Sequence, residues 1–295
     1  MKNLLNLFKP EYLLRPSQII RRIKNNQIQS GLIFAELPWR KKIKVNPRED
    51  LGKSILHLGY YELALSELIW RSLTKNSEAF LDIGTNIGYF PLLALEKKDF
   101  QGKIHAFEPH PGLYQLAAEN INLNKNSKRV EFHQIALSDS TGEASLFIPT
   151  DFKNNQGIAS LERPREGNLE EIVVKTKSLD EVCGKLRNII AKIDTEGHEA
   201  AVLRGARSLL GAGAFRCIFF EEFKSPNEAE TFTILKEFGF KIVRIKRTFW
   251  GPAFELPEKP MAHKIWEPIN YIAAPVNSDI WNTLDRPGWS IIWEN

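Results

Sequence analysis

A short turn with two glycines constrains the fold of this chain most. The apolar run 79–81 leads into Asp82, Gly84 and Gly88 follow four residues apart, and a helical pattern begins at Tyr89. Glycine lacks a Cβ atom, so it can take positive φ and let a ligand approach the main chain closely. The first turn of the next helix presents unpaired N–H groups over the same loop. The segment therefore predicts a strand, turn and helix that bind a nucleotide-like ligand, as in doubly wound folds.

The spacing of these glycines distinguishes between two ligands. The pattern is Gly-x-x-x-Gly preceded by Asp, whereas dinucleotide-binding turns carry Gly-x-Gly-x-x-Gly. This difference favours S-adenosylmethionine over NAD. An NAD-dependent enzyme on a similar sheet remains an alternative, as does a turn that only connects a strand to a helix.

Strand and helix patterns alternate along most of the chain, which predicts an α/β fold with a doubly wound, mostly parallel sheet. Apolar strands are expected at 79–82, 103–108, 130–137, 188–194, 217–220, 240–243 and 271–274. Helices are expected at 60–73, 89–97, 111–122, 199–210 and 232–238. Residues 140–178 break the alternation, because strands at 144–148 and 172–176 flank a polar stretch. This segment is expected to be an inserted β-hairpin or flap.

Acidic residues follow several of the expected strands. They are Asp82, Glu108, Asp194, Glu221 and Glu222. In a parallel sheet these strand ends open on one edge, where doubly wound folds bind their ligand. A carboxylate only accepts hydrogen bonds and has two oxygens, so Glu108 could hold both hydroxyls of a ribose. A surface acid is the alternative for Glu108.

Two further residues are weaker candidates for the same ligand. Ser138 lies in the loop after the third strand, where it could touch an adenine edge, although turn chemistry alone also favours serine there. Glu62 could close over the ligand at the start of a helix. An ordinary acidic residue in the first turn of that helix explains Glu62 equally well.

Four segments together resemble the FkbM family of S-adenosylmethionine-dependent methyltransferases. They are 81–88 (Leu-Asp-Ile-Gly-Thr-Asn-Ile-Gly), 106–109 (Ala-Phe-Glu-Pro), 178–180 (Ser-Leu-Asp) and 192–199 (Lys-Ile-Asp-Thr-Glu-Gly-His-Glu). The match runs in order over roughly residues 60–245, and the last segment is the most specific part. The resemblance implies a Rossmann-like class I methyltransferase fold. It also implies methyl transfer to a hydroxyl, commonly of a saccharide or a polyketide-type product.

The resemblance also implies roles for individual residues. Asp82, Gly84, Asn86 and Gly88 would lie against the methionine part of the cofactor, Glu108 would hold its ribose, and Asp194 would lie beside the reacting methyl group. The predicted cofactor site is completed by Thr85, Pro109, Ser138 and Glu62. No Asn-Pro-Pro-Tyr tetrapeptide of the kind found in many amino-directed methyltransferases follows the fourth strand, so oxygen is the expected nucleophile.

A hydroxyl acceptor needs a base or a metal to remove its proton. Asp194 and His198 are the candidate bases, followed by Glu196, although His198 could instead be a packing residue at a helix cap. With a side chain as the base, no metal is required. If one is present, Asp194, Glu221 and Glu222 could hold Mg²⁺, a hard cation that prefers oxygen ligands.

The resemblance divides the chain into three parts. Residues 1–59 form a basic N-terminal extension that is expected to be helical, residues 60–250 form the methyltransferase domain, and residues 251–295 complete the sheet or form an interface. Residues 1–50 contain eleven Lys/Arg and four Asp/Glu, a charge of +7. The whole chain has a net charge of +4, so the remaining residues carry −3. A basic helix at 18–32 could contact an anionic membrane surface, the domain itself or a second protomer.

The composition indicates the cellular compartment and the kind of partner. Cys183 and Cys217 form neither a disulfide framework nor a metal motif, so a reducing cytoplasm is expected. No run is long enough to span a membrane, and residues 1–9 lack the features of a signal peptide. A small-molecule or glycan acceptor is the expected partner and nucleic acid is not, although an RNA methyltransferase that uses the basic N-terminus, including the basic run 40–44, is a further alternative.

Overall fold

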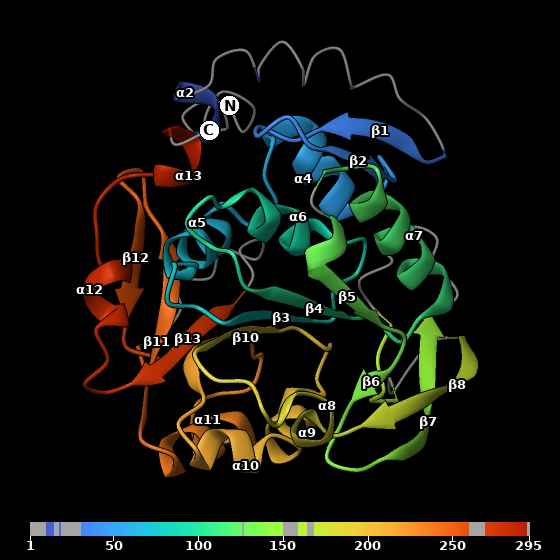
Figure 1. The fold of residues 1–295 in the computed structure, drawn as a ribbon, viewed down its shortest axis with the longest axis vertical. Helices are drawn as coiled ribbons and strands as arrows, with labels where there is room; N and C mark the ends of the chain where they lie inside the picture. Colours follow the sequence, from blue (N-terminus) through green and yellow to red (C-terminus); the bar gives the residue numbers. More distant parts are fainter. Residues whose placement is uncertain are drawn as a thin grey trace.

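The central feature of the fold is an eight-stranded sheet with the order β12-β11-β13-β10-β9-β3-β4-β5 (Figure 1). The computed structural model describes residues 10–14, 18, 31–125, 127–149, 159–163, 168–259 and 269–293. The strands are β3 Ala79–Ile83, β4 Lys103–Phe107, β5 Val130–His133, β9 Ile189–Ile193, β10 Phe215–Glu221, β11 Phe240–Arg247, β12 Pro252–Glu255 and β13 Asn270–Pro275.

The direction of the strands confirms the predicted fold class. The five strands from β5 to β10 are parallel, and β13 lies antiparallel between β10 and β11. Every residue of β3 and β9 is buried, as expected for parallel strands that are covered on both faces. The chain therefore has the mostly parallel, doubly wound sheet that the sequence predicted.

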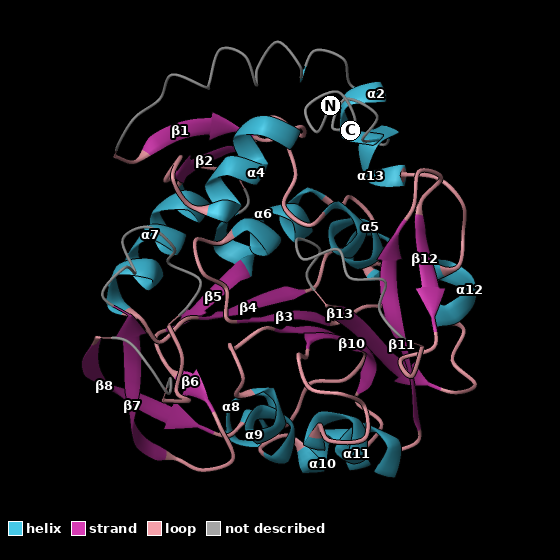
Figure 2. Cartoon of the chain, turned by 180° about the vertical axis from the view of Figure 1, so that it is seen from behind, coloured by secondary structure: helices cyan, strands magenta, loops and turns pink. Residues whose placement is uncertain are grey.

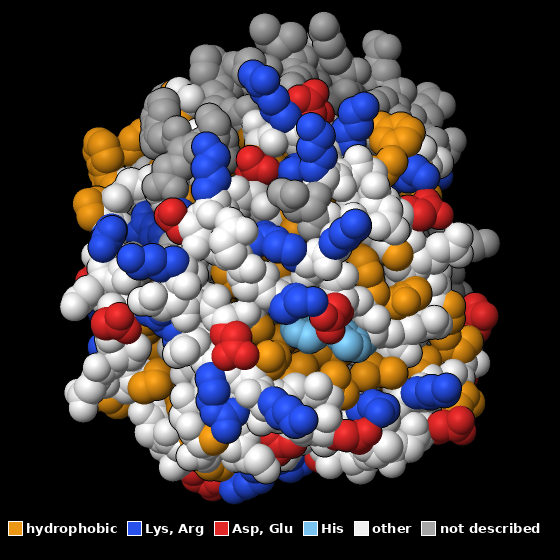
Figure 3. Space-filling view, viewed as in Figure 1, with side chains coloured by type: hydrophobic (Ala, Val, Ile, Leu, Met, Phe, Trp, Pro, Cys, Tyr) orange, Lys and Arg blue, Asp and Glu red, His pale blue; other side chains and the backbone are white. Residues whose placement is uncertain are grey.

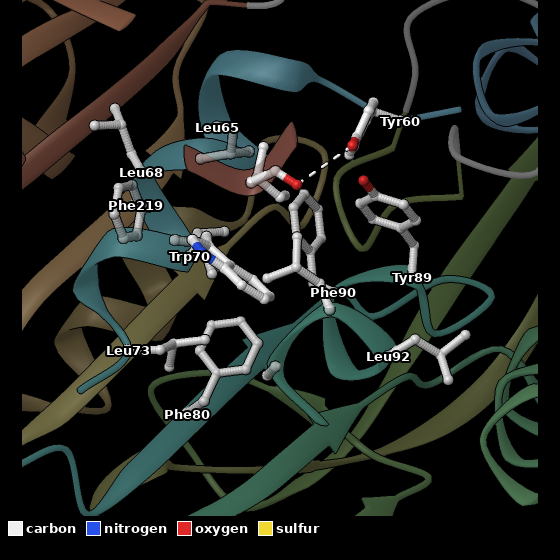
Figure 4. Packing of buried hydrophobic residues seen from close by; sticks show 14 of the residues in the cluster. Tyr60, Leu65, Leu68, Trp70, Leu73, Phe80, Tyr89, Phe90, Leu92 and Phe219 are labelled. Atoms are coloured by element: carbon white, nitrogen blue, oxygen red, sulfur yellow. Dashed lines mark hydrogen bonds between the residues drawn. The ribbon is translucent and has the colours of Figure 1, made fainter. Parts of the chain in front are cut away.

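Helices cover both faces of this sheet (Figures 1 and 2). One face carries α4 Asp50–Leu58, α5 Leu63–Ser72, α6 Tyr89–Glu96 and α7 Pro111–Asn122, and the other carries α8 Leu179–Cys183, α9 Glu199–Arg204, α10 Arg207–Gly211 and α11 Glu230–Glu237. Each layer has its own apolar core. Figure 4 shows Trp70 of α5 and Leu73, which follows this helix, facing Phe80 of β3 and Phe90 of α6.

The C-terminal helices α12 Ile280–Leu284 and α13 Ser290–Trp293 pack against α5 and are held there by hydrogen bonds. The Arg71 guanidinium donates hydrogen bonds to three carbonyl oxygens between residues 284 and 288. The carboxylate of Glu67 accepts from the backbone N–H groups of Ser290 and Ile291. Glu67 and Arg71 are both buried and pair with each other, so these charges are satisfied by one another and by the C-terminal backbone.

The predicted insertion forms a second sheet. It consists of β6 Ala136–Leu137, β7 Gly142–Pro149 and β8 Leu169–Lys177, in the order β6-β8-β7. The antiparallel pairing of β7 with β8 confirms the inserted hairpin, while 150–158 and 164–167 lie outside the described residues. The single strand predicted at 130–137 is wrong, because the chain leaves the main sheet after β5 and joins the hairpin sheet at β6.

The helix predicted at 199–210 is also divided, into α9 and α10. Gly205 separates the two helices. A Cβ atom at this position would lie 2.0 Å from the carbonyl oxygen of Ser138, so the chain approaches the loop after β6 more closely than any other residue type would allow.

The N-terminal part holds a β-hairpin as well as helices. Strand β1 Ile33–Glu36 pairs with β2 Lys42–Val45, a hairpin that the helical expectation for 1–59 missed. The Lys41 and Lys44 ammonium groups pair with Glu96 and Glu119, so part of the basic run 40–44 is neutralised within the molecule. The basic helix expected at 18–32 lies outside the described residues except for 18, 31 and 32. Among the residues that are described, no helix is both long and apolar enough to cross a membrane.

Candidate active site

The glycine turn joins β3 to α6 and touches the ends of both neighbouring strands. Gly84, Asn86 and Gly88 take φ values of 79°, 52° and 85°. The N–H groups of Gly84 and Thr85 both donate to the carbonyl oxygen of Phe107 at the end of β4. On the other side, a Cβ atom at Gly84 would lie 1.9 Å from the carbonyl oxygen of Asp194. Glycine is therefore required here by close backbone approach as well as by φ.

Glu108 follows β4 and faces this turn. Its Oε2 atom accepts from the N–H of Asn86 at 2.9 Å, and its Oε1 atom accepts from the N–H of His110 at 3.0 Å. Burial raises the pKa of Glu108 to about 7, against the opposing effect of these two hydrogen bonds. Each oxygen keeps a further lone pair, so the fixed carboxylate can still accept from a ligand.

A buried lysine in β9, Lys192, contacts the end of β3. It was not among the predicted site residues. The Nζ atom of Lys192 lies 3.1 Å from Asp194 Oδ2 and 3.7 Å from Asp82 Oδ1, and donates to the carbonyl oxygen of Gly84 at 3.0 Å. The Thr85 hydroxyl donates to Asp82 Oδ2 at 2.5 Å. Burial raises the pKa of Asp82 to about 6. Lys192 therefore fixes the turn and Asp194 relative to each other.

Several carboxylates gather beside Lys192. Oxygen atoms of Asp194, Glu196 and Glu221 lie within 4.8 Å of one another. Burial, with the nearby charge of Asp194, raises the pKa of Glu62 to about 7 and that of Glu196 to about 8. The same two causes raise the pKa of Glu221 above its usual range. At neutral pH the group therefore retains protons or needs a cation to compensate the like charges.

Glu222 does not join this group, contrary to its place in the predicted metal set. Its carboxylate accepts from the backbone N–H of Lys224 and from the hydroxyl of Thr231. Successive residues at a strand end point to opposite faces, so only one of Glu221 and Glu222 can face Asp194. The three carboxylates that lie close enough to share a cation are Asp194, Glu221 and, instead of Glu222, Glu196.

The turn after β9 is held by Glu199, which was not among the predicted site residues. Its Oε1 atom accepts from the N–H and hydroxyl of Thr195 and from the N–H of Gly197. The turn needs this support because Glu196 and Gly197 have φ values of 54° and 101°. An acid at the first position of the predicted helix was the only sequence signal for this role.

His198 precedes α9, and its side chain does not cap the helix. Its Nε2 atom lies 2.9 Å from Ser138 Oγ and its Nδ1 atom lies 3.0 Å from Glu162 Oε1. The ring thus connects the loop after β6 with the described segment 159–163 of the insertion. Ser138 is buried behind this histidine.

A single cavity unites most of the predicted residues. Gly84, Thr85, Asn86, Glu108, Pro109, Asp194, Glu196 and His198 line it. Asp82, Gly88, Ser138 and Glu62 do not line it, and Glu62 accepts from the side-chain amide of Asn270. Apolar walls come from Tyr61, Phe90 and Phe107, and the insertion contributes Leu146 of β7 and Leu161 of the segment 159–163. The cavity therefore has a fixed polar side and an apolar side that the insertion completes.

The sequence matches the family model described as the methyltransferase FkbM domain over residues 82–242. The chain belongs to the FkbM methyltransferase family. This FkbM protein is thus a methyltransferase, and the matched region includes the glycine turn, Glu108, Asp194 and the inserted hairpin. The alternative of an NAD-dependent enzyme is set aside.

Relatives of this FkbM protein include two curated methyltransferases. Methyltransferase sdnD of Sordaria araneosa is 28% identical over 201 residues, which is 58% of this chain and 76% of sdnD. Hexuronic acid methyltransferase AglP of Haloferax volcanii is 22% identical over 236 residues, which is 76% of this chain and 89% of AglP. The crystal structure of methyltransferase FkbM from Methylobacillus flagellatus is 15% identical with a TM-score of 0.41, and the match covers 68% of this chain and 44% of that one.

Proposed function

We propose that this protein is an S-adenosylmethionine-dependent O-methyltransferase that acts on a hydroxyl of a saccharide or a polyketide-type small molecule. The observation that carries the proposal is the cavity in which Glu108 and Asp194 lie on the two sides of the glycine turn. The first offers an acceptor for paired hydroxyls, and the second offers a base beside the same backbone.

The residues present fit this cofactor. The Glu108 carboxylate is buried and held by two backbone N–H groups, so it would accept from the ribose hydroxyls. Gly84, Thr85 and Asn86 would lie against the methionine part, and Asp82 and Gly88 would hold the conformation of the turn. When bound, S-adenosylmethionine supplies an electrophilic methyl group. What the chain must add is alignment of the acceptor and removal of its proton.

Asp194 is the proposed base. It lines the cavity, and the Lys192 ammonium at 3.1 Å fixes its carboxylate. Glu196 and His198 line the same cavity and are the other candidates. A saccharide acceptor is supported by the relative AglP, whose name assigns it a hexuronic acid substrate.

A cation-assisted version of the reaction is the alternative. Asp194, Glu196 and Glu221 offer three carboxylate groups within 4.8 Å, and oxygen ligands of this kind suit Mg²⁺. A cation held there would lower the pKa of an acceptor hydroxyl. Turnover that stops after treatment with a chelator and returns with Mg²⁺ supports this version, while unchanged turnover leaves Asp194 as the base.

The test is methyl transfer from labelled S-adenosylmethionine to a panel of hydroxylated glycans and polyketides. We expect label in at least one acceptor. The Asp194→Asn variant should bind the cofactor in calorimetry but lose turnover by roughly 100-fold or more, which is the usual contribution of a general base. Full turnover by this variant would remove Asp194 from the mechanism. Label transferred to no hydroxylated acceptor of the panel would contradict the proposed substrate class.

A further inference from the structure

Two histidines and a glutamate gather on the edge of the main sheet, outside the cavity described above. His105 lies in β4, and Glu131 and His133 lie in β5. The register pairs His105 with Glu131 and Phe107 with His133, so the side chains of all four residues share one face of the sheet. Figure 3 shows histidine side chains reaching the surface over these strands, with an acidic and a basic side chain beside them.

The three polar side chains are spaced like ligands of one ion. The distance from His105 Nδ1 to His133 Nε2 is 3.1 Å, and that from His105 Nδ1 to Glu131 Oε2 is 3.7 Å. Bonds of about 2.0–2.1 Å in a tetrahedral site separate neighbouring ligand atoms by roughly 3.3 Å. The short nitrogen–nitrogen distance also suits a hydrogen bond between two neutral rings, and the experiment below separates these two explanations.

The surroundings of His105 leave one of its ring nitrogens unused. The buried Nε2 atom of His105 has no hydrogen-bond partner in the described part of the chain, so the pair does not form a completed hydrogen-bond network.

The carboxylate is also held in a suitable position. Lys103 Nζ binds Glu131 Oε1 at 2.7 Å, which leaves Oε2 as the oxygen near His105. A partner that fixes the outer oxygen of a ligating carboxylate is a common feature of metal sites. The Glu131 side chain is 45% exposed, so an ion can enter from solvent and keep water as a further ligand.

We propose that His105, Glu131 and His133 form a binding site for a divalent transition metal, with Zn²⁺ as the matching ion. Two imidazoles and one carboxylate suit zinc, cobalt or nickel, whereas Mg²⁺ prefers oxygen ligands alone. The site is separate from the acidic group around Asp194, and the proposal does not depend on methyl transfer.

A metal at this site would stabilise the ends of β4 and β5, next to Glu108. The carbonyl oxygen of His133 accepts from the N–H of Glu108 at 3.1 Å. The His133 ring also stacks on Phe107 with 4.5 Å between ring centroids, and Phe107 lines the cavity. Because the folded chain presents the ligands together, the metal should also raise the thermal unfolding temperature.

The test uses the full chain after removal of metals by a chelator. Zn²⁺ binding is measured by calorimetry, and Co²⁺ serves as a spectroscopic probe of nitrogen ligation. We expect one site per chain at micromolar Zn²⁺. His133→Gln and His105→Gln should each weaken Zn²⁺ more than about tenfold, because even loss of an outer partner of a ligand costs 10–100-fold. His57→Gln, in helix α4, is the matched control and should bind as the wild type does.

Circular dichroism of each variant shows whether it is folded, and Glu131→Gln gives a third variant at the exposed ligand. Absence of Zn²⁺ binding to the wild type at submillimolar concentration would overturn the proposal and leave a hydrogen-bonded histidine pair. Equal affinity in His133→Gln and His57→Gln would also overturn it. Loss of Zn²⁺ binding in Glu196→Gln instead would assign the metal to the acidic group.

Discussion

At the scale of single residues, the cation of Lys192 organises the candidate site. Its ammonium lies among Asp82, Asp194 and the carbonyl oxygen of Gly84 and is almost fully buried. Removing one partner of a buried ion pair leaves an uncompensated charge and costs about 3–5 kcal/mol. We expect Lys192→Met to lower the free energy of unfolding by this amount at pH 8, measured by urea denaturation. Lys175→Met, at an exposed position of β8, is the control and should change it by less than about 0.5 kcal/mol.

A second prediction at this scale concerns the pH dependence of cofactor binding. The pKa of Glu108 is raised to about 7, and the ionised carboxylate is the better acceptor for ribose hydroxyls. Affinity for S-adenosylhomocysteine should therefore fall as the pH is lowered through 7, by up to about tenfold per pH unit. Calorimetry between pH 8 and pH 5.5 measures this. An affinity that is flat over this range would show that Glu108 does not hold the ligand in its charged form.

At the scale of elements, the contact between the glycine turn and the end of β9 can be separated from backbone strain. Gly84 and Gly213 both have positive φ, but a Cβ atom at Gly213 would meet open space, whereas one at Gly84 would meet the carbonyl oxygen of Asp194. Gly213→Ala should cost about 1–2 kcal/mol of unfolding free energy, the penalty of the left-handed conformation. Gly84→Ala should cost clearly more and should weaken cofactor binding. Equal losses in the two variants would mean that φ alone requires the glycine.

The sequence predicted the elements that depend on local pattern and missed those that depend on distant contacts. Apolar runs that end in an acid identified β3, β4, β9 and β10, and the structure brings Asp194 and Glu221 together there. The run 130–137 was misassigned as one strand, because an apolar pattern does not show which sheet each residue joins. The break at Gly205 likewise depends on a backbone approach to Ser138, 67 positions earlier in the chain.

Among the site residues, Lys192 was missed for a similar reason. A lysine inside an apolar strand reads as an interruption until its neighbours are known, and those neighbours are Asp82 and Gly84 of another strand and its turn. Glu222 was included in error, although the alternation of side chains along a strand could have separated it from Glu221. For Glu199, the sequence showed an acid at the first position of a predicted helix. It did not show the hydrogen bonds to Thr195 and Gly197, which depend on the conformation of the turn.

At the scale of the whole molecule, the buried carboxylates should make stability depend on pH. The pKa values of Glu62, Glu196 and Glu221 are all raised in the folded chain, so the folded state binds more protons than the unfolded state above about pH 4.5. The free energy of unfolding contributed by these groups should therefore fall as the pH rises from about 5 to 8. Denaturation of the unliganded protein across this range gives the slope.

Glu221→Gln isolates one of these groups. Glutamine resembles the protonated side chain, so the variant should match the wild type at pH 5 and be more stable at pH 8. Glu143→Gln, at an exposed position of β7, is the control and should leave the slope unchanged. A Glu221→Gln variant with the wild-type slope would show that Glu221 is already ionised in the folded protein at neutral pH.

The most direct test of the proposed cofactor site compares the binding of S-adenosylhomocysteine to the wild type and to Glu108→Gln by calorimetry at pH 8. We expect one site in the wild type and an affinity at least about tenfold lower in the variant, since hydrogen bonds to a charged group contribute about 1.5–3 kcal/mol. No binding to the folded wild type, or equal affinity in the two proteins, would contradict the proposed site.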